Sequence, residues 1–128
     1  MKIEKQLRNN RKVKIIWLDL DDYKRCGMYP PEILRDRVLE VLGTTRKRVF
    51  NGRRHVSVIL TKFIIIYFLR KYCINMSLAD IGRFTANPGS ENLKQIHCNA
   101  FNALRKIEAW IETDEALRDR VEMIDKML

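Results

Sequence analysis

Glycine and proline are scarce in this sequence, with 5 glycines and 3 prolines in 128 residues. Their scarcity excludes collagen-like, linker-like and disordered chains, while 46% hydrophobic residues are enough to build one core. The most apolar stretch, residues 56–69, contains Lys62 and is too short to cross about 30 Å of hydrocarbon. We therefore expect a buried core helix there, and no membrane partner.

Cysteine is scarce as well, since only Cys26, Cys73 and Cys98 are present, widely spaced and without a CxxC pair. An odd number at such spacing predicts reduced thiols rather than a disulfide framework. The polar stretch 1–6 lacks the apolar region of a secretory signal peptide. Both observations favour a cytoplasmic protein.

The motifs of common catalytic and metal sites are missing. There is no P-loop and no Gly-x-Ser-x-Gly, and neither His55 nor His97 has a Cys or His partner at metal-ligand spacing. The carboxylates Asp19, Asp21 and Asp22 lack the glycine and the distal glutamate of a calcium loop, which favours a solvated face or a helix end. We expect no enzymatic activity, no cofactor, no metal and no small-molecule substrate.

Positive charge is what the chain has in excess. Its 25 Lys and Arg against 16 Asp and Glu give a net charge of +9. The excess lies in residues 1–60, which hold 15 basic and 7 acidic side chains, against 10 and 9 in the rest. A basic half attracts polyanions such as nucleic acid or an anionic membrane surface, and an ordinary solvated surface is the alternative interpretation.

Hydrophobic periodicity and turn residues predict an all-α bundle of about six helices in a single domain. We divide it into an N-terminal extension (1–30), a core (31–112) and a C-terminal amphipathic helix (113–128). Capping residues mark several starts: Thr44 or Thr45, Ser77 with Asp80, and Ser90. The expected helices span residues 31–42, 46–50, 55–72, 77–84, 90–111 and about 114–128.

Residues 1–28 allow two interpretations. Val13, Ile16, Trp17, Leu20 and Tyr23 fit a helical period, whereas residues 13, 15 and 17 alternate as a strand would. We predict a helix for this segment.

A basic segment, residues 46–55, surrounds the Asn51-Gly52 turn. It carries five positive charges in nine residues and no acid. Such a cluster neutralises phosphates, and an arginine can also enter a narrow minor groove; a solvated loop is the alternative. The candidate DNA contacts here are Arg46, Lys47, Arg48, Arg53, Arg54 and His55.

The order of the elements beyond residue 77 is that of a helix-turn-helix: a short helix, a turn at 85–89 and a longer helix with a polar outer face. In that motif the second helix lies in the major groove, where amide side chains pair with adenine and lysine pairs with guanine. Any helical hairpin in a bundle gives a similar pattern.

The sequence resembles the C-terminal DNA-binding domain of the bacterial replication initiator DnaA, which has a Trp-repressor-like fold. The resemblance is carried by residues 38–43 (VLEVLG), 52–55 (GRRH), 77–83 (SLADIGR), 96–100 (IHCNA) and 102–108 (NALRKIE). It implies a binder of duplex DNA in a bacterium or phage, associated with the nucleoid. In that family an arginine of the basic loop contacts the minor groove and the signature residues read the major groove.

The chain departs from the family at the signature itself. Only His97 of the Asp-His-Thr-Thr core is kept, with Ile96, Cys98 and Asn99 at the other positions. The turn region is about seven residues longer, close to two helical turns, which can extend the recognition helix at its front. The residues expected at the groove are Ser90, Glu91, Asn92, Lys94 and Gln95, with His97 and Asn99 deeper or unused.

Two functions follow from these observations. The first is a sequence-specific double-stranded DNA-binding protein that regulates transcription or replication. The alternative is a protein–protein adaptor or dimerisation module that has lost DNA reading, with a homodimer formed through the C-terminal or N-terminal segment. Its motivation is the altered signature together with the apolar stripe Leu117, Val121, Ile124 and Leu128.

Overall fold

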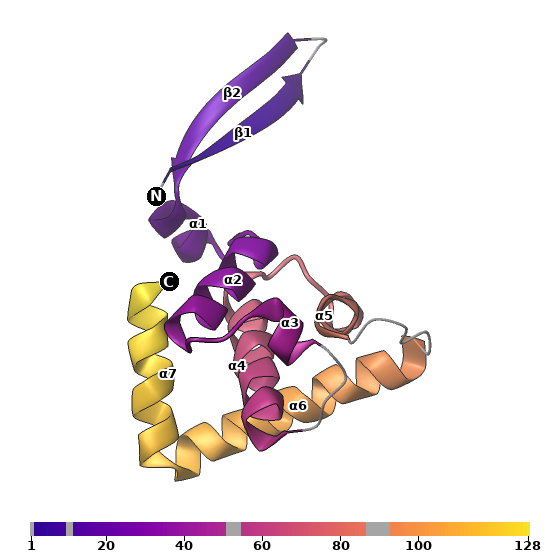
Figure 1. Ribbon diagram of the computed structural model, residues 1–128. Helices are drawn as coiled ribbons and strands as arrows, with labels where there is room; N and C mark the ends of the chain where they lie inside the picture. The colour runs from indigo at the N-terminus through magenta and orange to yellow at the C-terminus, as the bar shows by residue number, and fades with distance from the viewer. Residues whose placement is uncertain (1, 10–11, 51–54, 87–92) are drawn as a thin grey trace.

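The computed structural model describes residues 2–9, 12–50, 55–86 and 93–128, and this part of the chain is mostly helical (Figure 1). The described helices are α1 (Leu20–Cys26), α2 (Pro31–Val41), α3 (Arg46–Val49), α4 (Val56–Tyr72), α5 (Leu78–Thr85), α6 (Leu93–Thr113) and α7 (Glu115–Met127). The all-α prediction is confirmed for the described residues after Asp19, where α1 is the part of the helix predicted within residues 1–28 that the structure shows.

The helix predicted for the N-terminal segment is wrong up to Asp19. Strands β1 (Lys2–Asn9) and β2 (Lys12–Asp19) form an antiparallel pair, with Lys2 opposite Asp19 and Asn9 opposite Lys12. Three of four β2 residues from Val13 to Ile16 are β-branched, and such side chains favour an extended backbone over a helix. The alternating pattern was the correct one. In Figure 1 the hairpin extends beyond α1, away from the helical body.

The junction after α1 fastens the N-terminal segment to the end of α4. Gly27 has a φ of +72°, and a Cβ there would lie 2.8 Å from the Ile74 side chain, so the position requires glycine. The Gly27 carbonyl accepts a hydrogen bond from the Ile74 amide at 2.8 Å, and the Tyr29 amide donates to the Tyr72 carbonyl at 3.0 Å. These backbone bonds hold α1 beside the C-terminal end of α4.

The predicted helix boundaries between residues 31 and 50 are confirmed. Proline occupies the first position of α2, and Gly43, with a φ of +69°, follows its C-terminal end. Thr45 caps α3, where its side chain accepts a hydrogen bond from the Arg48 amide. Local sequence signals were sufficient here because each cap acts on its own helix.

Helix α4 forms the centre of the helical body. Figure 1 shows it between α5 and α7, with α6 crossing near its first turns. It contains Ile64, Ile65, Phe68 and Leu69, all of which are almost completely buried. Since neighbours pack on several of its sides, it is apolar over nearly its whole circumference, as the sequence predicts. None of the described helices is both long and apolar enough to cross a lipid bilayer.

The end of α7 is bound to α1 and α4 through Asp125. Its carboxylate lies 3.1 Å from the Lys24 ammonium and 2.8 Å from the Lys71 ammonium, and it accepts a hydrogen bond from the Tyr72 hydroxyl. Burial alone would raise the pKa of Asp125, but hydrogen bonds from Lys71, Tyr72 and Lys24 hold this pKa below its ordinary value. Burial, together with the hydrogen bond to Asp125, raises the pKa of Tyr72 to about 12.

The apolar stripe of the C-terminal helix is buried within the chain itself. Leu117, Val121, Ile124 and Leu128 all belong to the main hydrophobic core, and α7 packs on α6 and α2. The stripe therefore has an intramolecular partner. This burial removes one of the two observations that motivated the adaptor hypothesis.

Candidate nucleic-acid interface

Helix α5 begins with a complete capping box. The Ser77 hydroxyl accepts a hydrogen bond from the Asp80 amide, and the Asp80 carboxylate accepts one from the Ser77 amide, both at 3.1 Å. The aspartate thus performs the task that glutamate usually has in this motif, as the sequence predicts. The hydrogen bonds from Ser77 lower the pKa of Asp80, and Arg83 lies 3.0 Å from the same carboxylate.

Helices α5 and α6 lie very close to one another at Gly82. A Cβ at this position would lie 2.6 Å from Cγ2 of Ile96 and 2.7 Å from the Ile96 carbonyl oxygen. Such distances are below any normal contact, so only glycine lets the two backbones come this near. Ile96 is buried, and its burial fixes the rotation of α6 about its own axis.

The exposed surface of α6 around Ile96 is polar. Gln95, His97, Cys98 and Asn99 are all exposed, and Nε2 of Gln95 donates to Oδ1 of Asn99 at 2.9 Å. We call Gln95 and Asn99 the polar row; His97 is exposed as well, but it lies roughly 160° around the helix from Gln95. The two amides are one helical turn apart, so they lie above one another on one side of the helix.

Four of the residues expected at the groove lie wholly or partly outside the described part of the chain. Ser90 and Asn92, like Glu91, lie outside the described residues, and so does the predicted cap at Ser90. Lys94 is part of α6, but its side chain is outside the described part. The first candidate residue on α6 whose side chain is described is therefore Gln95.

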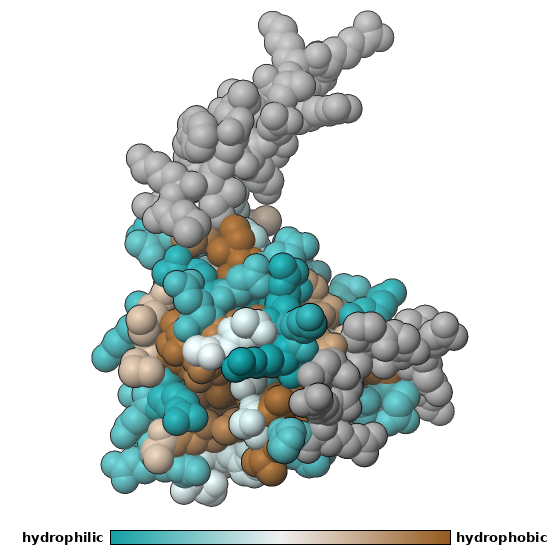
Figure 2. Space-filling view, viewed as in Figure 1, coloured by the Kyte–Doolittle hydropathy of each residue, from teal (hydrophilic) through white to brown (hydrophobic). Residues whose placement is uncertain are grey.

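Helix α3 presents the first half of the basic segment. Arg46, Lys47 and Arg48 are all exposed, and Figure 2 shows hydrophilic side chains gathered over this part of the visible face. Arg46 lies 3.6 Å from the carboxylate of Asp36 on α2, an exposed pair that solvent weakens. The other two cations form no ion pair with any described residue.

The second half of the basic segment is only partly described. Arg53 and Arg54 lie outside the described residues. His55 is exposed and is the N-cap residue of α4, although its side chain makes no capping hydrogen bond. Residues 46–48 and 55 thus flank the part of the segment in which those two arginines lie.

Helix α4 supports both parts of the candidate interface. It packs on α3, which carries the described cations, and on α5 and α6, which carry the capping box and the polar row. Arg35 of α2 reaches α5, where its guanidinium lies 4.8 Å from the centre of the Phe84 ring. No local pattern indicates this contact, because the two residues are far apart in the chain.

The remaining candidate groups behave as ordinary structural residues. Asp22 pairs with Arg25 in α1, where Asp21 and Asp22 occupy the first turn, so these carboxylates mark a helix end. No group of three His, Cys, Asp or Glu within the described ranges is arranged to hold a metal ion. Trp110 is stacked on Phe63 with ring centres 5.7 Å apart, yet it keeps 40% of its surface exposed.

Comparison of the chain with protein-family models, with curated proteins and with solved structures finds no match. Any functional assignment therefore depends on the residues and geometry described above.

Proposed function

We propose that this protein is a sequence-specific double-stranded DNA-binding protein that regulates transcription or replication, with α5 and α6 as its helix-turn-helix. The observation that carries the proposal is the close crossing of α5 and α6 at Gly82 and Ile96. It fixes α6 with its apolar side inward and its polar row outward, which is the presentation that a recognition helix needs.

The polar row supplies the chemistry for reading bases. Amide side chains donate and accept hydrogen bonds at adenine, and the Gln95 and Asn99 amides lie on one face of a helix that has the width of a major groove. Their mutual hydrogen bond orients both amides before DNA arrives. His97 is exposed as well, but it lies roughly 160° around the helix from Gln95 and does not belong to this face.

The basic segment supplies the attraction to phosphates. Lys47 and Arg48 are exposed cations without a described acidic partner, and Arg53 and Arg54 follow in the sequence. Such contacts do not read sequence, but they fix the position of the protein on the duplex. The resemblance to the DnaA domain supports the same division of tasks between a basic loop and a recognition helix.

The adaptor hypothesis is favoured less. Its structural motivation was an unpartnered apolar stripe on the last helix, and that stripe is buried in the chain's own core. The altered signature alone does not distinguish a lost function from a changed sequence preference.

Fluorescence anisotropy with a labelled duplex tests the proposal. We expect the full chain to bind duplex DNA at low salt, with an affinity that falls steeply as salt rises because counterions are released. Selection from a pool of random duplexes should then enrich one sequence motif. Absence of duplex binding at low salt contradicts DNA binding altogether, whereas binding without enrichment contradicts sequence specificity.

A further inference from the structure

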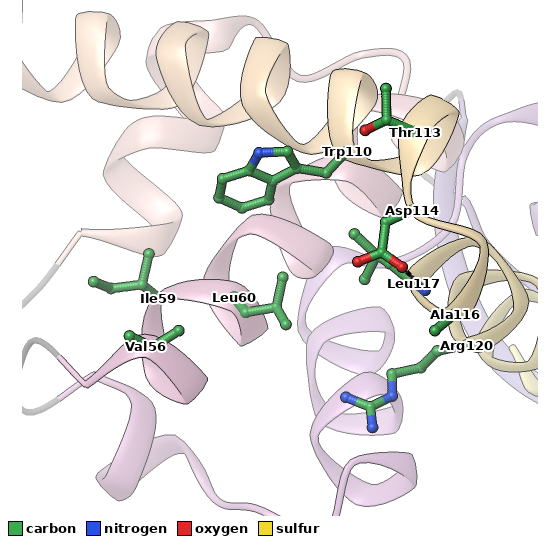
Figure 3. Close-up of a pocket in the computed structure, with 9 residues that line it drawn as sticks. All are labelled: Val56, Ile59, Leu60, Trp110, Thr113, Asp114, Ala116, Leu117 and Arg120. Atoms are coloured by element: carbon green, nitrogen blue, oxygen red, sulfur yellow. Dashed lines mark hydrogen bonds between the residues drawn. The ribbon is translucent and has the colours of Figure 1, made fainter.

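An apolar pocket of about 670 Å³ opens where three helix ends meet (Figure 3). The first turns of α4 contribute Val56, Ile59 and Leu60, the end of α6 contributes Trp110, and the start of α7 contributes Leu117. Small-molecule sites in proteins are mostly apolar and span roughly 300–1,000 Å³, so this pocket has the size and the lining of such a site.

Two of these residues leave large apolar surfaces exposed at the pocket. Val56 is 82% exposed and Trp110 is 40% exposed, whereas most other aliphatic residues of α4 are buried or half-buried. An apolar molecule lying against both would remove this surface from water, which is the main source of favourable binding free energy for such ligands. The pocket therefore favours a ligand with an apolar body.

The polar groups of the pocket decide which charge the ligand carries. Thr113 donates its hydroxyl to the Ala109 carbonyl at 3.0 Å, and Asp114 accepts a hydrogen bond from the Leu117 amide at 3.2 Å. The Thr113 hydroxyl is thus bound to the preceding turn of α6, and Asp114 caps α7, whose first turn compensates its negative charge. Arg120, in contrast, is exposed at the edge of the pocket and forms no ion pair with a described residue.

We propose that this pocket binds a small amphiphilic carboxylate. Its apolar body lies against the aliphatic side chains of α4 and the Trp110 indole, and its carboxylate pairs with the Arg120 guanidinium. Arginine suits this task because its planar fork binds a carboxylate through two parallel hydrogen bonds. One arginine balances one negative charge, which favours a carboxylate over a doubly charged phosphate monoester. The inference is independent of DNA binding.

The test uses the fluorescent probe 8-anilinonaphthalene-1-sulfonate, which combines an apolar ring system with one negative charge, and the full chain without DNA. We expect saturable binding of one probe molecule per chain. Decanoate should displace the probe, whereas decanol, with the same chain length and no charge, should displace it at least several-fold less well. Equal displacement by the two compounds would contradict the assigned role of Arg120.

Two variants locate the site. Arg120→Gln should weaken probe and decanoate binding about fivefold, since it removes a charged hydrogen bond at an exposed rim. Ala116→Phe should abolish binding, because Ala116 is an exposed lining residue and the ring would fill the pocket. Arg70→Gln removes an exposed arginine at the other end of α4 and should leave binding unchanged.

Melting temperatures establish that each variant is folded. If Ala116→Phe proves unfolded, two comparisons still test the proposal. These are the comparison of Arg120→Gln with Arg70→Gln and the comparison of decanoate with decanol. Probe binding that is absent, that is unaffected by Arg120→Gln, or that Arg70→Gln weakens equally would overturn the proposal. Dimers in solution that Ala116→Phe converts to monomers would also overturn it, because they would identify a second copy of the chain as the occupant of the pocket.

Discussion

Lys24 and Asp125, which are 101 positions apart in the chain, are joined by two contacts. The Lys24 ammonium lies 3.1 Å from the Asp125 carboxylate and donates a hydrogen bond of 2.6 Å to the Asp125 backbone carbonyl. The contact links the two ends of the helical body, because α1 and the end of α7 both pack against α4 at this point. The Tyr72 hydroxyl and the Lys71 ammonium bind the same carboxylate. Asp125 therefore holds three helices together.

The first prediction concerns acid stability. The pKa of Asp125 is below its ordinary value in the folded chain, so the unfolded chain takes up a proton on this carboxylate first as pH falls. Its stabilising contribution is complete above the unfolded pKa of about 3.9 and is lost as pH falls through the lower folded pKa. We expect the free energy of unfolding to decline from about pH 5 downwards, as measured by urea denaturation.

Replacing Asp125 by asparagine separates its contribution to acid stability from that of the other carboxylates. Asp125→Asn should lower the free energy of unfolding by about 1–2 kcal/mol at pH 7 and make its decline in acid shallower. Asp119→Asn changes an exposed carboxylate of the same helix and should leave the profile as it is in the unaltered chain. Identical acid profiles for Asp125→Asn and the unaltered chain would contradict the assigned network.

The second prediction concerns the crossing of α5 and α6. Replacing a glycine inside a helix by alanine ordinarily stabilises the helix by about 1 kcal/mol. At Gly82 the added methyl group meets the backbone of Ile96, which cannot rotate away, so Gly82→Ala should destabilise the protein by about 1–3 kcal/mol. Urea denaturation measures the difference in the free energy of unfolding between Gly82→Ala and the unaltered chain. The sign of this difference tests whether the two helices are as close as described. A stabilised Gly82→Ala protein would show that the helices are further apart than described.

Local signals in the sequence were sufficient for most helices but not for the N-terminal segment. Ser77, Asp80 and Thr45 act on their own helix ends, and for this reason the starts of α3 and α5 could be predicted. The period of residues 13–23 was ambiguous because β2 runs directly into α1 at Leu20. The helical period fitted α1 and was wrongly extended backwards over the strand, where β-branched residues decide the conformation.

Contacts between distant segments were beyond the reach of sequence patterns. Gly82 was recognised only as part of a family-like stretch, and nothing around it indicated that Ile96 would come within 2.6 Å of an added Cβ. The apolar pocket had no signal either, since Val56, Trp110 and Arg120 come from three helices that meet only in the folded chain. The outward position of Gln95 was predictable because it depends on the period of one helix, whereas Asn99, expected to be deeper or unused, is exposed beside it.

The third prediction separates phosphate contacts from base contacts. Lys47→Ala and Arg48→Ala should weaken binding to all duplexes and reduce the slope of log affinity against log salt by about 0.9 for each phosphate that is no longer neutralised. Arg53→Ala and Arg54→Ala are expected to act in the same way. Lys126→Ala removes an exposed cation in the last turn of α7 and should leave the slope unchanged.

Substitution in the recognition helix should instead change the preferred sequence. Gln95→Ala is expected to cost about 1–3 kcal/mol on the selected duplex and much less on a random one, and Asn92→Ala should behave alike. Anisotropy with both duplexes at one salt concentration measures the ratio. If Gln95→Ala weakens binding to the two duplexes equally, α6 does not read bases through this residue.

The fourth prediction uses the cysteines as reporters of the interface. Cys98 is exposed between His97 and Asn99, Cys26 is exposed at the end of α1, and Cys73 is buried. Burial raises the pKa of the Cys73 thiol to about 11, so its reactive thiolate is scarce near neutral pH. In a Cys26→Ser protein, maleimide should therefore label Cys98, and a saturating amount of the selected duplex should slow this labelling several-fold because α6 is covered.

The matched control is a Cys98→Ser protein, in which Cys26 is the reactive thiol. The negative potential of DNA disfavours any nearby thiolate, so a general effect of the duplex would slow the labelling of Cys26 as well. Protection of Cys98 alone locates the duplex on the outer face of α6, since Cys26 lies at the end of α1, which is held beside the C-terminal end of α4. Equal labelling of Cys98 with and without bound duplex would contradict α6 as the recognition helix, even if the protein binds DNA through its basic segment.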